Sequence, residues 1–171
     1  MMSETPVAFV LGSDTDWPMV ESAVKLMDDL GIGFEVEVFS PHRTPERLHD
    51  YGSNLEARGF KVVIAASGGA AHLAGVLAAL TALPVIGVPV PSTSLSGVDA
   101  LYSIVQMPAG VPVATVGIGS AGPKNAVVFA LKILGVDNPD YRARVHEYKE
   151  NLVAESEQKA ERVRVDWEEK S

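Results

Sequence analysis

The chain has 171 residues, of which 47% are hydrophobic and 21% charged; this composition suits one globular domain and excludes a disordered chain. The formal net charge of −8 argues against a nucleic-acid partner, because phosphate backbones are bound by basic surfaces. The absence of cysteine excludes disulfides, thiolate nucleophiles and cysteine-ligated metals.

The opening residues show no signal-peptide pattern. The opening residues 1–6 lack a basic segment followed by a long apolar run, and no uninterrupted apolar stretch of about 20 residues occurs. We therefore expect no signal peptide, no membrane span and a cytoplasmic location.

Short apolar segments alternate with segments of helical periodicity along the first 137 residues. The apolar segments predict strands over 7–11, 34–39, 62–66, 85–88 and 113–116. The periodic segments predict helices between Asp16 and Gly31, between Thr44 and Gly59, and over 72–80, 97–106 and 123–134. Asp16 is the expected capping side chain of the first helix. Such alternation predicts an α/β fold, a parallel sheet with helices on both faces.

After Asn138 the sequence becomes charged and polar. One apolar stripe continues at helical spacing through Tyr141, Val145, Tyr148 and Leu152. We expect a long C-terminal helix that docks on the body or on a neighbouring subunit. The chain is thus divided into a catalytic α/β domain over 1–137 and a helical extension of the same domain over 138–171.

Ligands of parallel sheets bind beyond the carboxyl ends of the strands, and the first candidate segment follows the first strand. Gly12 allows a sharp turn, Ser13 and Thr15 offer hydroxyl groups, and the helix start after Asp16 offers free N–H groups to an anion. The alternative is an ordinary strand-to-helix turn with a helix cap.

The second candidate segment, residues 40–45, follows the second strand. Pro41 stiffens the backbone that presents His42, and a histidine can both give and take a proton near neutral pH. Arg43 can bind a phosphate or a carboxylate. The alternative is a solvated loop in which Thr44 caps the next helix.

The third candidate segment, residues 66–75, follows the third strand. Its small residues let a ligand approach the backbone closely and suit a neutral species such as carbon dioxide. His72 stands at the expected helix start, where it can orient the site. The alternative is a glycine turn with a helix start.

The rest of the sequence argues against dinucleotide binding, a catalytic zinc site and serine-hydrolase chemistry. Residues 117–122 match a dinucleotide-binding fingerprint, with Asp137 20 residues beyond Gly117, but no second strand follows to carry that acid. No histidine pair has zinc-helix spacing, and no Gly-x-Ser-x-Gly elbow occurs. We expect neither a metal nor a cofactor.

Together these segments resemble the class I N5-carboxyaminoimidazole ribonucleotide mutases, over roughly residues 7–135. The matching motifs are Gly12-Ser13-Asp14-Thr15-Asp16-Trp17, His42-Arg43-Thr44-Pro45, Gly68-Gly69-Ala70-Ala71-His72-Leu73, and the segments 83–90, 103–108 and 110–116. The chain departs from the usual family pattern at Pro41, Ala66, Ser67, Ala74 and Ala109.

The resemblance implies a flavodoxin-like three-layer sandwich, assembled as a homo-octamer with sites near subunit contacts. It implies the ATP-independent conversion of N5-carboxyaminoimidazole ribonucleotide to 4-carboxy-5-aminoimidazole ribonucleotide in purine biosynthesis. His42 would be the general acid/base, with His72 in a supporting role, and Arg43 would contact the substrate's phosphate. The other substrate-binding residues would be Gly12, Ser13, Thr15, Asp16, Ser40, Ser67, Gly68, Gly69, Ala70 and Leu73.

Two alternatives remain at this stage. Aminoimidazole ribonucleotide carboxylases that use free carbon dioxide share the fold, but the segment 68–72 favours the mutase class. A binding module could instead sense a phosphoribosyl ligand without chemistry, although His42 beside Arg43 favours an enzyme.

Overall fold

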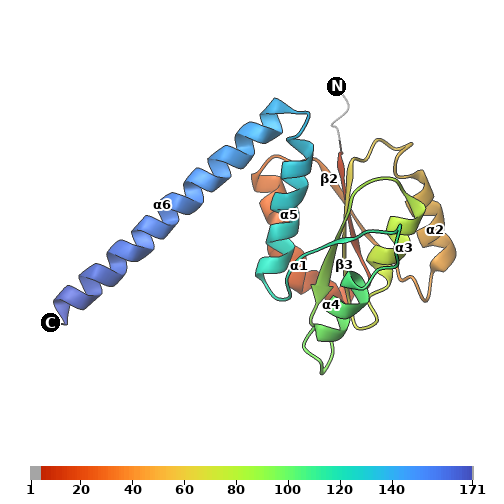
Figure 1. Ribbon diagram of the computed structural model, residues 1–171, viewed down its shortest axis with the longest axis horizontal. Coiled ribbons are helices and arrows are strands. Elements are labelled where there is room, and N and C mark those ends of the chain that lie inside the picture. The colour runs from red at the N-terminus through yellow and green to blue at the C-terminus, as the bar shows by residue number, and fades with distance from the viewer. Residues whose placement is uncertain (1–4, 171) are drawn as a thin grey trace.

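The protein forms one five-stranded parallel sheet with helices on both faces (Figure 1). The computed structural model describes residues 5–170; residues 1–4, on which the expectation of no signal peptide partly rests, lie outside them. The strands are β1 (Val7–Leu11), β2 (Phe34–Val38), β3 (Val62–Gly68), β4 (Val85–Val90) and β5 (Ala114–Thr115). Their order, β2-β1-β3-β4-β5, is that of the predicted flavodoxin-like fold, which is confirmed.

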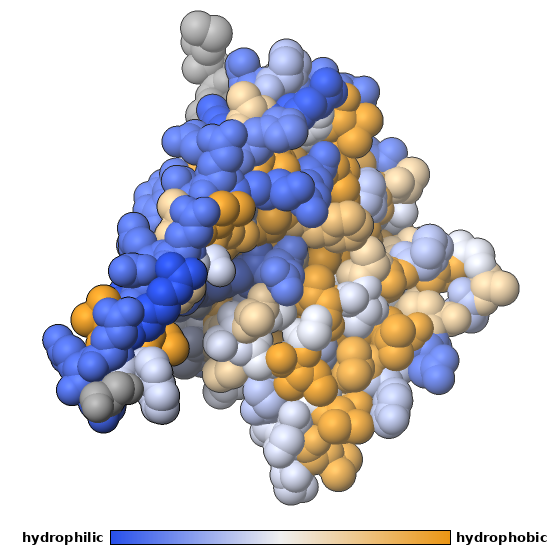
Figure 2. Space-filling view, turned by 60° about the vertical axis from the view of Figure 1, so that its left-hand side comes forward, coloured by the Kyte–Doolittle hydropathy of each residue, from blue (hydrophilic) through white to orange (hydrophobic). Residues whose placement is uncertain are grey.

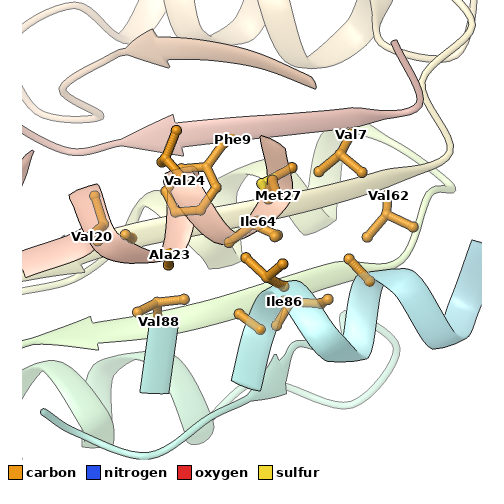
Figure 3. Close-up of a cluster of buried hydrophobic side chains, with 14 of the residues drawn as sticks. Val7, Phe9, Val20, Ala23, Val24, Met27, Val62, Ile64, Ile86 and Val88 are labelled. Carbon is orange, nitrogen blue, oxygen red and sulfur yellow. The ribbon is translucent and has the colours of Figure 1, made fainter. Parts of the chain in front are cut away.

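The helices form the outer two layers. They are α1 (Trp17–Asp29), α2 (Pro45–Asn54), α3 (Leu73–Leu80), α4 (Val98–Val105), α5 (Ala121–Leu134) and α6 (Pro139–Glu169), and a 3-10 turn over Asp14–Asp16 precedes α1. Helices α1 and α5 cover one face of the sheet, where Figure 3 shows Phe9 and Ile64 packed against Val24 and Met27. The other face is covered by α2, α3 and α4. Because both faces are buried, the inner strands are apolar except for Ser67 near the end of β3.

The register of the sheet brings several strand ends to one edge. Leu11 of β1 pairs with Val38 of β2 on one side and with Ala66 of β3 on the other. The loops after β1 and β2 therefore start at the same level of the sheet, and the loop after β3 starts two residues beyond it. This edge is where the three candidate segments lie.

Several element boundaries differ from those predicted. β3 and β4 are each two residues longer than expected, because Ser67 pairs with Pro89 and Gly68 with Val90. β5 is shorter than the predicted strand over 113–116, because only Ala114 and Thr115 pair with β4. α2 ends at Asn54, well before Gly59, and α5 begins at Ala121, two residues early.

The long terminal helix is confirmed, and its first turns dock on the body. Asn138 caps it by accepting bonds from the backbone N–H groups of Asp140 and Tyr141. Tyr141 and Val145 pack against the core, and Arg144 donates to the Leu30 and Gly31 carbonyls at the end of α1. From residue 151 to 169 all side chains are exposed, and the helix extends away from the body (Figure 1).

Gly87 on β4 lets α4 and the segment before β5 pack against the sheet. A Cβ placed there would lie 2.8 Å from Cγ1 of Val113 and would collide with Ile104. We expect Gly87→Ala to lower the free energy of unfolding by about 1–3 kcal/mol, the usual cost of overpacking a core. Urea denaturation measures it. Gly117→Ala is the control, because a Cβ placed on Gly117 would meet no atom within 4 Å outside its chain neighbours; equal stability of the two variants would contradict the prediction.

Candidate active site

A cleft of about 250 Å³ opens at the carboxyl edge of the sheet and joins all three candidate segments. Its lining residues are Gly12, Ser13, Thr15, Asp16, Ser40, Pro41, His42, Arg43, Ser67, Gly68, Ala70, His72 and Ser92. The structure thus brings together 11 of the 13 residues that the sequence assigned to the site. The other two, Gly69 and Leu73, do not line the cleft.

The segment after β1 is held by a reciprocal capping box. The Ser13 hydroxyl accepts a bond from the Thr15 N–H, and the Asp16 carboxylate accepts one from the Ser13 N–H at 3.1 Å. Asp16 stands at the N-cap position of α1, as predicted, but its side chain makes no capping bond to that helix, because it turns back to Ser13, the residue that caps the preceding 3-10 turn. This geometry leaves a carboxyl group only 3% exposed at the wall of the cleft.

The segment after β2 forms a tight turn that presents two functional side chains. The Ser40 hydroxyl accepts a bond from the Arg43 N–H at 3.1 Å, and the Thr44 hydroxyl accepts from the Ser40 N–H and donates to the Ser40 carbonyl. His42 and Arg43 are exposed at the tip. Within residues 5–170 the Arg43 guanidinium has no ion pair, so its charge is available to an anionic ligand.

The two candidate histidines meet across the cleft. Nε2 of His42 lies 2.6 Å from Nδ1 of His72, and the rings meet edge to face with centroids 4.7 Å apart. Only one of the two facing nitrogens can carry a proton in such a hydrogen bond. The pair therefore shares one proton inside the cleft, as a proton-transfer site requires.

The segment after β3 forms the floor of the cleft. Ser67 is 4% exposed, and its hydroxyl oxygen has no hydrogen-bond partner among the described residues. Leu73 is fully buried in the core under α2, α3 and α4, so its side chain does not reach the cleft. Gly69 adopts a φ of 62°, which favours glycine, and turns toward Thr93.

Ser92 lines the cleft but was missed by the sequence analysis. It follows β4 and packs so closely on Gly68 that a Cβ on Gly68 would collide with it. The prediction ended the fourth strand at Val88 and considered no segment after it. The rule that ligands bind beyond strand ends would have found this residue.

Two further features bear on cofactors and membranes. Among residues 5–170 no group of three or more metal-ligating side chains gathers, and no helix there is long and apolar enough to cross a bilayer. The Gly117–Gly122 fingerprint opens α5, but α5 leads into α6 rather than into a strand that could carry Asp137.

Comparison with known proteins extends the similarity over nearly the whole chain. Residues 6–155 match the family model described as AIR carboxylase. An N5-carboxyaminoimidazole ribonucleotide mutase from Pyrococcus horikoshii is 46% identical over 170 residues, which are 98% of this chain and 95% of the relative. One from Thermotoga maritima is 49% identical over 157 residues, 92% of this chain and 91% of the relative. The crystal structure of Treponema denticola PurE matches with a TM-score of 0.80 and 27% identity, over 89% of this chain and 94% of that chain.

Asp16 makes stability depend on pH. Its burial raises the pKa of the carboxyl above the usual 3.8; the bond from the Ser13 N–H opposes this, and the nearby Asp14 charge adds to it. The folded protein therefore binds this proton more tightly than the unfolded chain does. The contribution is fully present below the unfolded pKa and is lost as the pH rises through the folded pKa.

We expect Asp16→Asn, which keeps an oxygen for the Ser13 N–H without the charge, to be at least as stable as the native protein at neutral pH. The advantage should shrink as the pH is lowered toward the usual carboxyl range. Urea denaturation across this range measures it, with Asp28→Asn on the exposed face of α1 as control. A variant that is less stable than the native protein at neutral pH would refute the argument.

Proposed function

This chain belongs to the AIR carboxylase family, and we propose that its cleft converts N5-carboxyaminoimidazole ribonucleotide into 4-carboxy-5-aminoimidazole ribonucleotide, without ATP, in purine biosynthesis. The observation that carries the proposal is the His42–His72 hydrogen bond inside the cleft that also holds Arg43. A phosphate sensor needs the arginine but not two histidines that share a proton.

Arg43 and Ser13 have the chemistry to bind the substrate's phosphate. The guanidinium is free of intramolecular ion pairs within the described residues, and a charge-assisted bond to phosphate is about twice as strong as a neutral one. Ser13 lines the same cleft and is half-buried, and its hydroxyl group can donate a hydrogen bond to a phosphate oxygen. The Ser40 hydroxyl stabilises the turn that presents Arg43, because it accepts a bond from the Arg43 backbone N–H.

In the first step, the bond between the exocyclic nitrogen and the carboxylate carbon breaks. Carbon dioxide forms, and the electron pair left on nitrogen takes a proton from protonated His42. In the second step, ring carbon 4 attacks carbon dioxide and a carbon–carbon bond forms, while neutral His42 removes the proton from carbon 4. His42 thus regains the proton that it gave, and no cofactor is consumed.

His72 and the floor of the cleft support these steps. The 2.6 Å bond fixes the His42 ring and keeps the exchangeable proton between two nitrogens. Gly68 and Ala70 line the cleft with small, uncharged surface that suits carbon dioxide, and exclusion of water by the bound substrate would prevent the escape of the gas.

The proposal includes a homo-octamer in the cytoplasm. Support for assembly comes from apolar side chains that have no cover in one subunit: Val98, Tyr102 and Val105 follow one another along one face of α4, and Leu95 stands beside them, all exposed. Figure 2 shows hydrophobic side chains gathered on the lower part of the body and a largely hydrophilic α6. Apolar faces of this kind mark subunit contacts.

Transfer of a labelled carboxylate tests the reaction. We expect the purified protein to convert the N-carboxylated ribonucleotide to the carbon-4 acid without ATP, metal or added bicarbonate. With a carbon-labelled carbamate, most of the label should remain in the product even in excess unlabelled bicarbonate, because the cleft retains the carbon dioxide. Mass spectrometry of the product measures this.

The same experiment separates the alternatives. A product whose label matches the bicarbonate pool would identify a carboxylase that uses free carbon dioxide. Nucleotide binding without any conversion would identify a sensor.

His42 is expected to carry the proton transfer. His42→Asn should fold and bind nucleotide normally but lose about a hundredfold or more in kcat, as removal of a general acid/base does. His49→Asn is the matched control, because His49 lies exposed on α2 and does not line the cleft. Turnover near the native rate in folded His42→Asn would overturn the assignment.

A further inference from the structure

The hydroxyl group of Thr44 serves a turn and not the helix that it precedes. Thr44 stands at the N-cap position of α2, where a threonine ordinarily accepts a bond from one of the first N–H groups of the helix, yet its side chain makes no such bond. Instead the hydroxyl accepts a bond from the Ser40 N–H at 3.2 Å and donates one to the Ser40 carbonyl at 3.1 Å. A helix cap is therefore not what this side chain supplies.

The turn that Thr44 closes is tied to the core at both ends but carries its functional side chains at an exposed tip. Before the turn, Phe39 is buried and its N–H donates to the last carbonyl of β1 at 2.9 Å. After the turn, Leu48 on α2 is fully buried. His42 and Arg43 lie between these anchors and are exposed. Their positions therefore depend on the bonds that close the turn.

The closing bonds converge on Ser40. Its carbonyl accepts from both the backbone N–H and the hydroxyl of Thr44, at 2.9 and 3.1 Å, and its N–H donates to that same hydroxyl. Its own hydroxyl accepts from the Arg43 N–H, which leaves the hydroxyl proton available to a ligand in the cleft that Ser40 lines. Loss of the Thr44 hydroxyl would leave the backbone bond in place, so the turn would loosen without unfolding.

We propose that Thr44 is a positioning residue for the reaction. By fixing Ser40, its hydroxyl group keeps Nε2 of His42 in reach of Nδ1 of His72. It also keeps Arg43 at the wall of the cleft. Thr44 does not line the cleft itself, so it acts only through the turn. The inference rests on the proposed function for the roles of His42 and Arg43.

Two substitutions of Thr44 separate its hydroxyl from its shape. Thr44→Val keeps the branched side chain without the hydroxyl, and Thr44→Ser keeps the hydroxyl. With full-length protein below its melting transition, we expect Thr44→Val to lower kcat about 5- to 20-fold, the range of one or two lost neutral hydrogen bonds. KM should rise about 2- to 5-fold, because Arg43 lies on the same turn. Thr44→Ser should restore both constants to within about twofold of the native values. Thr44→Ala gives the same test if the valine variant does not fold.

Thr81→Val is the matched control. Thr81 is also half-buried, and its hydroxyl likewise accepts one backbone N–H bond, from Leu83, and donates one bond, to Glu56. It lies between α3 and β4, at the edge of the sheet opposite the cleft. We expect both valine variants to melt at a lower temperature than the native protein, but Thr81→Val should keep the native kcat and KM.

A double variant distinguishes positioning of His42 from a general loss of structure. If Thr44 acts on turnover through the His42 ring, removing its hydroxyl should cost little once that ring is gone. We expect Thr44→Val to lower the kcat of the His42→Asn variant less than about twofold, because the two effects are not additive. Its effect on KM, which passes through Arg43, should persist.

The outcomes are distinct. Native kinetics in folded Thr44→Val, no recovery in Thr44→Ser, or an equal loss of kcat in the native and His42→Asn backgrounds would overturn the positioning role while the proposed function stands. A native protein that does not convert the N-carboxylated ribonucleotide at all would overturn the proposed function, and this inference with it.

Discussion

The cleft depends on the register that brings neighbouring strand ends to one edge of the sheet. Leu11 pairs with both Val38 and Ala66, so β1 and β2 end at one level and β3 continues for two residues beyond it. A slip of one residue in any pairing would turn the side chains of that strand to the opposite face, because successive residues alternate. The cores on both faces prevent that slip: Phe9 faces α1 and α5, while Ala8 and Val10 face the other layer. Packing far from the site thereby fixes the distance between the two histidines.

Much of this arrangement could be predicted from local sequence. Apolar runs indicated the strands, and their order along the chain placed His42, Arg43 and His72 at the same edge. What escaped prediction depends on contacts between distant segments. The bond between His42 and His72 joins residues 30 positions apart, and the burial of Leu73 follows from the packing of α3 on the sheet. Helical periodicity does not show the 3-10 turn before α1, and this turn engages the Asp16 side chain with Ser13 and not with the first N–H groups of α1.

Gly12 illustrates how the reason for a residue can differ from the one that its motif suggests. The sequence analysis explained it by a sharp turn, but Gly12 is not among the glycines with positive φ. Its constraint comes from β3, because a Cβ on Gly12 would lie 2.9 Å from Cβ of Ser67. The absence of a side chain at one position thus serves the side chain on the neighbouring strand. A motif read along one chain segment cannot show this, since the conflict appears only once two strands pair.

The charges at the site explain how an acidic protein can bind an anionic nucleotide in one orientation. The net charge of −8 gives no general attraction for phosphate, so binding must rely on local groups. Arg43 offers a cation beside His42, whereas Asp14 and Asp16 place carboxylates in the segment after β1. In the proposed function the phosphate lies at Arg43 and the Ser13 hydroxyl, and the Asp16 carboxylate keeps it from moving further along the segment after β1. In the proposed mechanism this polarity leaves the reacting ring beside the histidine pair, where one proton is sufficient because each cycle returns the proton that it uses.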